Sequence, residues 1–302
     1  RLLIGPWDHG VDPQRYYGDV DFGPDIESFD MQAVRDRWFD YHLKGEDNGL
    51  EDEAPISIFV MGANEWRDEW EWPLERAENM RLYLSSEGFA NSLFGNGRLV
   101  EEAISAADSD QYEYDPARPT PSYGGHGCCP YVPLAIGPFD QRSIQQREDV
   151  LVYTSEILEE DMEITGHPSV QLSVSLDVPD TDFFVTLSDV HPDGTAIPIT
   201  EGSLRVRYRD SFTDPELLEV DTIEELAIPL WATSNVFKAG HRLRIHVTSS
   251  NFPRYARNLN SGGDLAQESA DDMQVATPTI YHSDEHQSWI DLPLIPAGSR
   301  PN

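Results

Sequence analysis

Lysine is almost missing from this 302-residue sequence, in which Lys44 and Lys238 are the only two and arginine supplies the remaining basic residues. Basic residues number 21 against 55 acidic ones, giving a formal net charge of −34. So much like charge opposes compaction at ordinary ionic strength, whereas molar salt, with a Debye length of about 3 Å, screens the repulsion. We therefore expect a protein of a halophilic archaeon that keeps its cytoplasm salty, located in that cytoplasm. The alternative, an ordinary acidic secreted protein, leaves the scarcity of lysine unexplained.

Long apolar runs are also missing, and none approaches the roughly 18–20 residues that a membrane span needs. No basic segment followed by an apolar one marks a secretion signal, which would stand upstream if the chain is a fragment. No basic patch could neutralise a phosphate backbone. We expect neither a nucleic acid nor a membrane as a partner.

Cysteine occurs only twice, as the adjacent pair Cys128 and Cys129 in a Gly- and Pro-rich loop. Neighbouring cysteines cannot join distant segments, so a disulfide framework is excluded. Two packed small residues, a vicinal disulfide and a role in lining a pocket remain open. A metal site would need more ligands nearby than His126, and we expect neither a metal nor another cofactor.

Aromatic residues, by contrast, are plentiful, with seven Trp, twelve Tyr and twelve Phe, and a disordered acidic chain lacks them. The first ten residues read as a short apolar strand and a Gly-Pro turn that presents Trp7, Asp8 and His9. Such a turn is typical of the end of an α/β-hydrolase domain, where the catalytic order is Ser, then Asp or Glu, then His. A loop or core histidine bonded to a carbonyl is the alternative for His9.

No serine lies in a Gly-x-Ser-x-Gly turn, so the chain holds no candidate nucleophile. We therefore expect the serine and the acid upstream and interpret the chain as the C-terminal part of a hydrolase. His282 and His286 have the spacing of a metal-binding pair, but their Pro- and Ser-flanked segment favours a polar surface instead.

Secondary-structure patterns divide the chain in two. Apolar spacing predicts a helix from Ile26 to Leu43 capped by Asp25, then a buried strand over Pro55–Met61 and an acidic linker over Asn64–Pro73. From Arg81 onward, short alternating runs separated by turns predict an antiparallel sandwich, a galactose-binding-like jelly roll. The expected class is mainly β, with a remnant of an α/β-hydrolase domain at 1–76 and a jelly roll at 77–302.

Several segments, taken in order along nearly the whole chain, resemble the CocE/NonD hydrolases, the group of cocaine esterases, α-amino acid ester hydrolases, glutaryl acylases and X-Pro dipeptidyl-peptidases. The segments that carry the resemblance are Gly5–His9, Trp38–Gly45, Phe59–Arg67, Tyr114–Pro116, Pro121–Gly125, Asp140–Arg142, Asp149–Tyr153, Asp180–Phe183, Gly240–Arg244 and Ser249–Arg254.

The resemblance implies a Ser-His-Asp triad, an acyl-enzyme intermediate and small ester or amide substrates. Of the triad, only the His position transfers to this chain, as His9. The resemblance also implies that Gly127, Cys128 and Cys129 lie near the acyl pocket, to which we add Trp7 beside the histidine.

Two further hypotheses stay open. The hydrolase half that carries the nucleophile belongs to the same gene or to a separate chain, or the jelly roll is a non-catalytic binding module for a carbohydrate or a partner domain. The apolar edge Leu2–Ile4 would also favour pairing with a second copy in a homo-oligomer.

Overall fold

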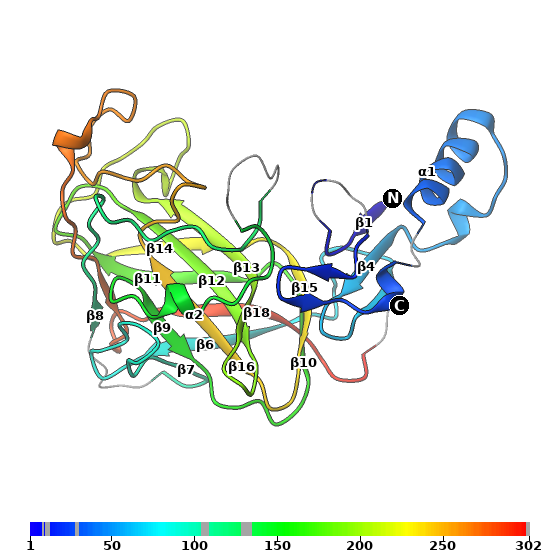
Figure 1. The fold of residues 1–302 in the computed structure, drawn as a ribbon, viewed down its shortest axis with the longest axis horizontal. Coiled ribbons are helices and arrows are strands. Elements are labelled where there is room, and N and C mark those ends of the chain that lie inside the picture. The colour runs from blue at the N-terminus through cyan, green and yellow to red at the C-terminus, as the bar shows by residue number, and fades with distance from the viewer. Residues whose placement is uncertain (8, 10–12, 28–29, 104–108, 128–134, 300–302) are drawn as a thin grey trace.

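The structure, a computed structural model, describes residues 1–7, 9, 13–27, 30–103, 109–127 and 135–299. Most of them belong to one large, mainly antiparallel sheet that folds back on itself as a sandwich (Figure 1). Its strands are β6 (Glu78–Ser85), β7 (Arg98–Val100), β8 (Ser109–Gln111), β9 (Leu151–Thr154), β10 (Met162–Gly166), β11 (Ser169–Ser175), β12 (Asp182–Val190), β13 (Ala196–Arg205), β14 (Glu224–Pro229), β15 (Thr233–Phe237), β16 (Arg242–Thr248), β17 (Thr279–Tyr281) and β18 (Trp289–Ile295). The mainly β sandwich that the sequence predicts is confirmed.

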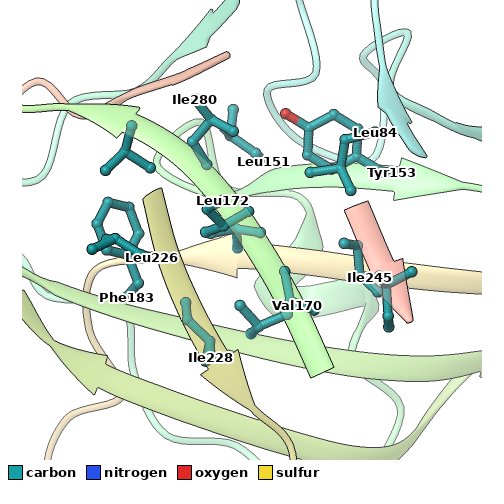
Figure 2. Packing of buried hydrophobic residues seen from close by; sticks show 14 of the residues in the cluster. Leu84, Leu151, Tyr153, Val170, Leu172, Phe183, Leu226, Ile228, Ile245 and Ile280 are labelled. Atoms are coloured by element: carbon teal, nitrogen blue, oxygen red, sulfur yellow. The ribbon is translucent and has the colours of Figure 1, made fainter. Parts of the chain in front are cut away.

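The core lies between the inner faces of this sandwich, where alternate residues of each strand meet. Leu172 on β11, Leu226 on β14 and Ile245 on β16 are fully buried there (Figure 2). Burying such an aliphatic side chain stabilises the fold by about 1.5–3 kcal/mol. Every residue of β12 is buried, so both faces of this strand are covered.

A smaller sheet contains the first strand of the chain and lies beside the sandwich (Figure 1). Its order is β1-β4-β5, with β1 parallel to β4 and β4 antiparallel to β5. The elements outside the sandwich are β1 (Leu2–Ile4), the hairpin of β2 (Tyr16–Tyr17) and β3 (Val20–Asp21), α1 (Met31–Phe39), β4 (Ile56–Val60) and β5 (Glu65–Glu69). The short helical turns are η1 (Pro24–Ile26), η2 (Asp40–Lys44), η3 (Leu50–Asp52), α2 (Arg142–Gln145), η4 (Val206–Tyr208) and η5 (Ala270–Asp272).

The helix predicted over Ile26–Leu43 is shorter than expected. Its regular part, α1, begins after Asp30, whose carboxylate accepts a hydrogen bond from the Ala33 backbone N–H at 2.9 Å. Asp25, the predicted cap, lies instead within the separate turn η1. That prediction was wrong because a cap must directly precede the first turn of the helix, and α1 begins only at Met31, where Asp30 holds that position.

The predicted acidic linker over Asn64–Pro73 is partly a strand, β5. Its last residue, Glu69, is fully buried and forms ion pairs with Arg67 and Arg76. The Arg67 guanidinium also donates two hydrogen bonds, of 2.8 and 2.6 Å, to the carboxylate of Glu163 on β10. Burial would raise the pKa of Glu163, but the bonds from Arg67 and Thr165 outweigh it and lower that pKa. The ion pair between Arg67 and Glu163 thus connects the small sheet to the sandwich.

Backbone contacts make a second connection. The N–H of Met61, just after β4, donates to the Ser234 carbonyl at 3.0 Å, and the Val236 N–H donates to the Met61 carbonyl at 2.8 Å. Gly62 has a φ of +76°, and a Cβ there would lie 2.2 Å from the Val236 oxygen, so only glycine allows this approach. The small sheet ends at Glu69 and β6 begins at Glu78, while the domain boundary at 76/77 stays a prediction. No helix in the described part of the chain is long and apolar enough to cross a membrane.

Candidate functional site

A cavity of about 890 Å³ opens where the small sheet meets the sandwich. Residues after β1, on β4, on β13 and at the start of β15 line it, and so do two loop segments between β8 and α2. Met61 and Ser234, which form the backbone connection between the sheets, are part of its wall. Its apolar lining includes Ile4, Trp7, Tyr17, Phe22, Ile58, Phe59, Met61, Ile136, Phe139 and Ile199.

His9 lies on the turn that follows β1 and lines the cavity with an exposed side chain. The turn is shaped by Trp7, whose ring lies against the backbone at Gly5: a Cβ there would be 2.3 Å from Trp7 Cζ3. The Trp7 ring in turn packs against Trp66 of β5, with centroids 5.7 Å apart. The local sequence thus holds the histidine at the rim of the small sheet.

A buried carboxylate organises another wall. Glu201 on β13 accepts hydrogen bonds from the backbone N–H of His126 at 2.7 Å and from the Arg254 guanidinium, and its Oε1 lies 3.2 Å from His126 Nδ1. Gly125, with a φ of +77°, leaves room for these oxygens, since a Cβ would lie 2.8 Å from Oε1. Burial would raise the pKa of Glu201, but the bonds and charges of His126 and Arg254 lower it. The carboxylate is thus kept ionised and fixes the loop.

The loop held by Glu201 continues along the cavity. His126 stacks on Trp231, with centroids 5.7 Å apart and an interplanar angle of 16°, and Gly127 lines the cavity beside it. Sequence reasoning missed Glu201, Trp231 and the link to Arg254. Only Arg254 could have been found from the sequence, because it belongs to the segment Ser249–Arg254 that carries the family resemblance.

Three predicted site residues, Trp7, His9 and Gly127, therefore line one cavity although Gly127 lies far from the other two in the chain. Cys128 and Cys129 lie outside the described residues. Metal ligands were not expected here, and the one group of His, Cys, Asp or Glu side chains in the described part of the chain that could hold an ion shares no residue with the cavity lining.

The surface position predicted for His282 was wrong, because this side chain is fully buried. Its Nε2 lies 3.0 Å from Asp110 Oδ2 and 3.2 Å from the hydroxyl of Ser86. The acid and the serine share one ring nitrogen, whereas a catalytic histidine uses one nitrogen for each. Together with its burial, this makes the Ser-His-Asp group a structural network of the sandwich.

Comparison with known proteins gives a consistent result. The family described as the X-Pro dipeptidyl-peptidase C-terminal non-catalytic domain matches residues 48–291. A cocaine esterase of Rhodococcus sp. (strain MB1 Bresler) is 42% identical over 299 residues, covering 98% of this chain and 51% of the esterase.

Solved structures agree with these sequence matches. An aminopeptidase of a marine-sediment Thaumarchaeota archaeon superposes with a TM-score of 0.85 at 28% identity, covering 97% of this chain and 49% of that one. An α-amino acid ester hydrolase gives a TM-score of 0.81 at 29% identity, with coverages of 97% and 50%. The chain thus spans about half the length of each of these proteins.

Proposed function

Because the chain belongs to the family of the X-Pro dipeptidyl-peptidase C-terminal non-catalytic domain, we propose that it is the C-terminal part of a serine hydrolase. The whole enzyme would cleave ester or amide bonds of small acyl or aminoacyl substrates. The names of the relatives, a cocaine esterase, an aminopeptidase and an α-amino acid ester hydrolase, support this reaction class. His9 precedes the matched residues 48–291, in keeping with a catalytic role outside the non-catalytic domain.

The observation that carries the proposal is that His9, Trp7 and Gly127 line the same cavity. In the proposed mechanism, His9 takes the proton of a serine hydroxyl as that oxygen attacks the substrate carbonyl. The protonated imidazole then gives the proton to the leaving alcohol or amine, and an acid oriented on its other nitrogen stabilises its charge. Water hydrolyses the acyl-enzyme by the same route. The serine and the acid would belong to the other half of the hydrolase, which either precedes these residues in the same chain or is a separate chain.

The cavity suits the acyl part of such a substrate. Its volume of about 890 Å³ lies within the range of roughly 300–1,000 Å³ typical of small-molecule sites. The apolar lining around Phe22, Phe59 and Ile136 would receive the acyl chain. Gly127 lines this cavity, and the proposal includes Cys128 and Cys129, which follow it in the sequence, as residues near the acyl pocket.

Apolar residues that are exposed outside the cavity support the proposal that another domain packs against the small sheet and α1. No residue of α1 is buried, Trp38 and Phe39 are 36% and 48% exposed, and Leu43 in η2 is 76% exposed. We assign this surface to the hydrolase half. Leu2 on the edge strand β1 is 42% exposed, and pairing of that edge with a second copy is the competing arrangement.

The test is a comparison of full-length protein and the 302-residue chain in p-nitrophenyl ester hydrolysis. We expect the full-length protein to be active, His9→Ala to abolish turnover, and the 302-residue chain to be inactive. His286→Ala is the matched control, because His286 packs against Tyr281 of the sandwich and does not line the cavity. Turnover by the 302-residue chain that His9→Ala abolishes would refute the missing nucleophile, and an active full-length His9→Ala enzyme would refute the role of His9.

The net charge of −34 and the scarcity of lysine further support a halophilic archaeal source and a cytoplasmic location. Both belong to the proposal.

A further inference from the structure

Two turns at one end of the sandwich bring together three metal-binding side chains. β12 and β16 are antiparallel neighbours in which Val190 pairs with Arg242. His191 directly follows the first of these strands and His241 directly precedes the second, so the pairing places the two histidines side by side. Asp189 lies on β12 one residue before its end.

The side chains of these residues converge. Asp189 Oδ1 lies 2.8 Å from His241 Nδ1, and Asp189 Oδ2 lies 3.9 Å from His191 Nε2. The two imidazole rings are 4.5 Å apart between centroids, and one ligand atom from each of the three residues lies within 4.8 Å of the others. Ligand atoms about 2.0–2.1 Å from a tetrahedral zinc ion are about 3.3 Å apart, so small side-chain rotations are enough to enclose an ion.

We propose that Asp189, His191 and His241 form a binding site for a divalent transition-metal ion, with Zn²⁺ as the reference ligand. Two imidazoles and one carboxylate match the ligand preference of Zn²⁺ and its neighbours, whereas Ca²⁺ and Mg²⁺ prefer oxygen ligands alone. Three protein ligands leave the fourth position for water, and the 40% exposed side chain of His191 places that position at the surface.

The surroundings favour a cation and hold the ligands in place. Asp189 is only 7% exposed, so water solvates its carboxylate poorly. A bound cation would therefore stabilise this carboxylate. The His191 N–H donates to the Thr195 carbonyl at 2.8 Å and the His241 N–H donates to the Lys238 carbonyl at 3.0 Å, so both turns have a fixed backbone. The ion would join the β12–β13 hairpin to the turn before β16.

The experiment is a titration of the 302-residue chain, freed of metal with EDTA, with Zn²⁺ by calorimetry and by thermal melting. A nitrate salt at about 1 M screens unspecific attraction by the acidic surface. We expect one Zn²⁺ per chain, a higher Tm with Zn²⁺, and no competition from excess Ca²⁺. His191→Ala and His241→Ala should each weaken binding by at least about 100-fold, the upper end of what even the loss of a supporting residue costs.

His286→Ala is the matched control, because His286 is partly buried against Tyr281 and belongs to no such group. If His241→Ala does not fold, His191→Ala carries the test, since this side chain is largely at the surface. Visible absorption of the Co²⁺-loaded chain, present in the wild type and absent in His191→Ala, gives an independent readout. Binding that His191→Ala leaves unchanged, absence of saturable Zn²⁺ binding, or equal competition by Ca²⁺ would overturn the proposal. None of these readouts depends on hydrolase activity.

Discussion

Replacement of Glu201 by alanine should destabilise the protein by about 3 kcal/mol, because it leaves the Arg254 guanidinium without its carboxylate. Breaking a buried ion pair costs roughly 3–5 kcal/mol, and we expect the lower end because the Glu201 and Arg254 side chains keep 11% and 18% exposure. The substitution also removes the acceptor of the His126 N–H, so the loop at Gly125–Gly127 keeps its backbone bonds to Gly137 but loses its side-chain anchor.

The measurement is urea unfolding in molar KCl, with the free energy taken from the midpoint and slope. Glu87→Ala is the matched control, because Glu87 pairs with Arg98 at 3.9 Å with side chains 78% and 50% exposed. Such a surface pair contributes at most about 1 kcal/mol. If Glu201→Ala costs no more than Glu87→Ala, the argument that this ion pair supports the cavity wall is refuted.

The pH dependence of the same residue provides a second measurement. The folded-state pKa of Glu201 lies below its ordinary value of 4.5, so the carboxylate stabilises the fold fully above that pH. This contribution is lost as the pH falls through the lowered pKa, because folding must then compete with proton binding by the unfolded chain. The stability difference between wild type and Glu201→Gln should therefore shrink below pH 4.5. A difference that stays constant into acid would contradict the lowered pKa.

Two further predictions concern the contact between the sheets and the charge of the whole chain. Gly62→Ala should lower the free energy of unfolding by about 2–4 kcal/mol, because its Cβ would meet the Val236 oxygen at 2.2 Å in addition to the unfavourable φ. Gly45→Ala is the control, because Gly45 has a φ of +71° and no atom within 4 Å of the added Cβ. In the same unfolding assay this control should lose only about 1 kcal/mol. The net charge of −34 predicts that Tm rises steadily from dilute buffer to molar KCl as repulsion is screened; a Tm independent of KCl would argue against adaptation to salt.

Much of the sandwich could be predicted from the sequence because its strands are short runs rich in apolar and β-branched residues, separated by turns rich in Gly, Pro, Asp and Asn. Two such runs in the sequence, Leu151–Thr154 and Asp182–Val190, form β9 and β12. The sequence gives a weaker signal for β18, because Pro293 interrupts its apolar pattern. Pro293 pairs only with Asn79 on β6 and lies between the stretches of β18 that pair with β10 and with β11. A missing N–H is tolerated in such a gap, which no local pattern reveals.

The residues of the candidate site likewise differ in how far the sequence alone could reveal them. The turn after β1 carries a local signature, since Gly5, Pro6 and Trp7 set the backbone that presents His9, and the sequence alone singled out that histidine. Glu201 has no such signature, because it is one of 55 acidic residues and most acidic side chains remain in water. What distinguishes it is burial against Arg254 and a loop distant in the chain.

The sequence by itself determined the fold class, the acidic character and the position of His9, all of which depend on composition or on neighbours along the chain. Only the tertiary structure decided that Glu69, Glu201 and Asp189 are buried among cations or imidazoles. The physical reason is that desolvation and ionic pairing depend on distances in space. Strand pairing sets these distances between residues that lie far apart in the sequence.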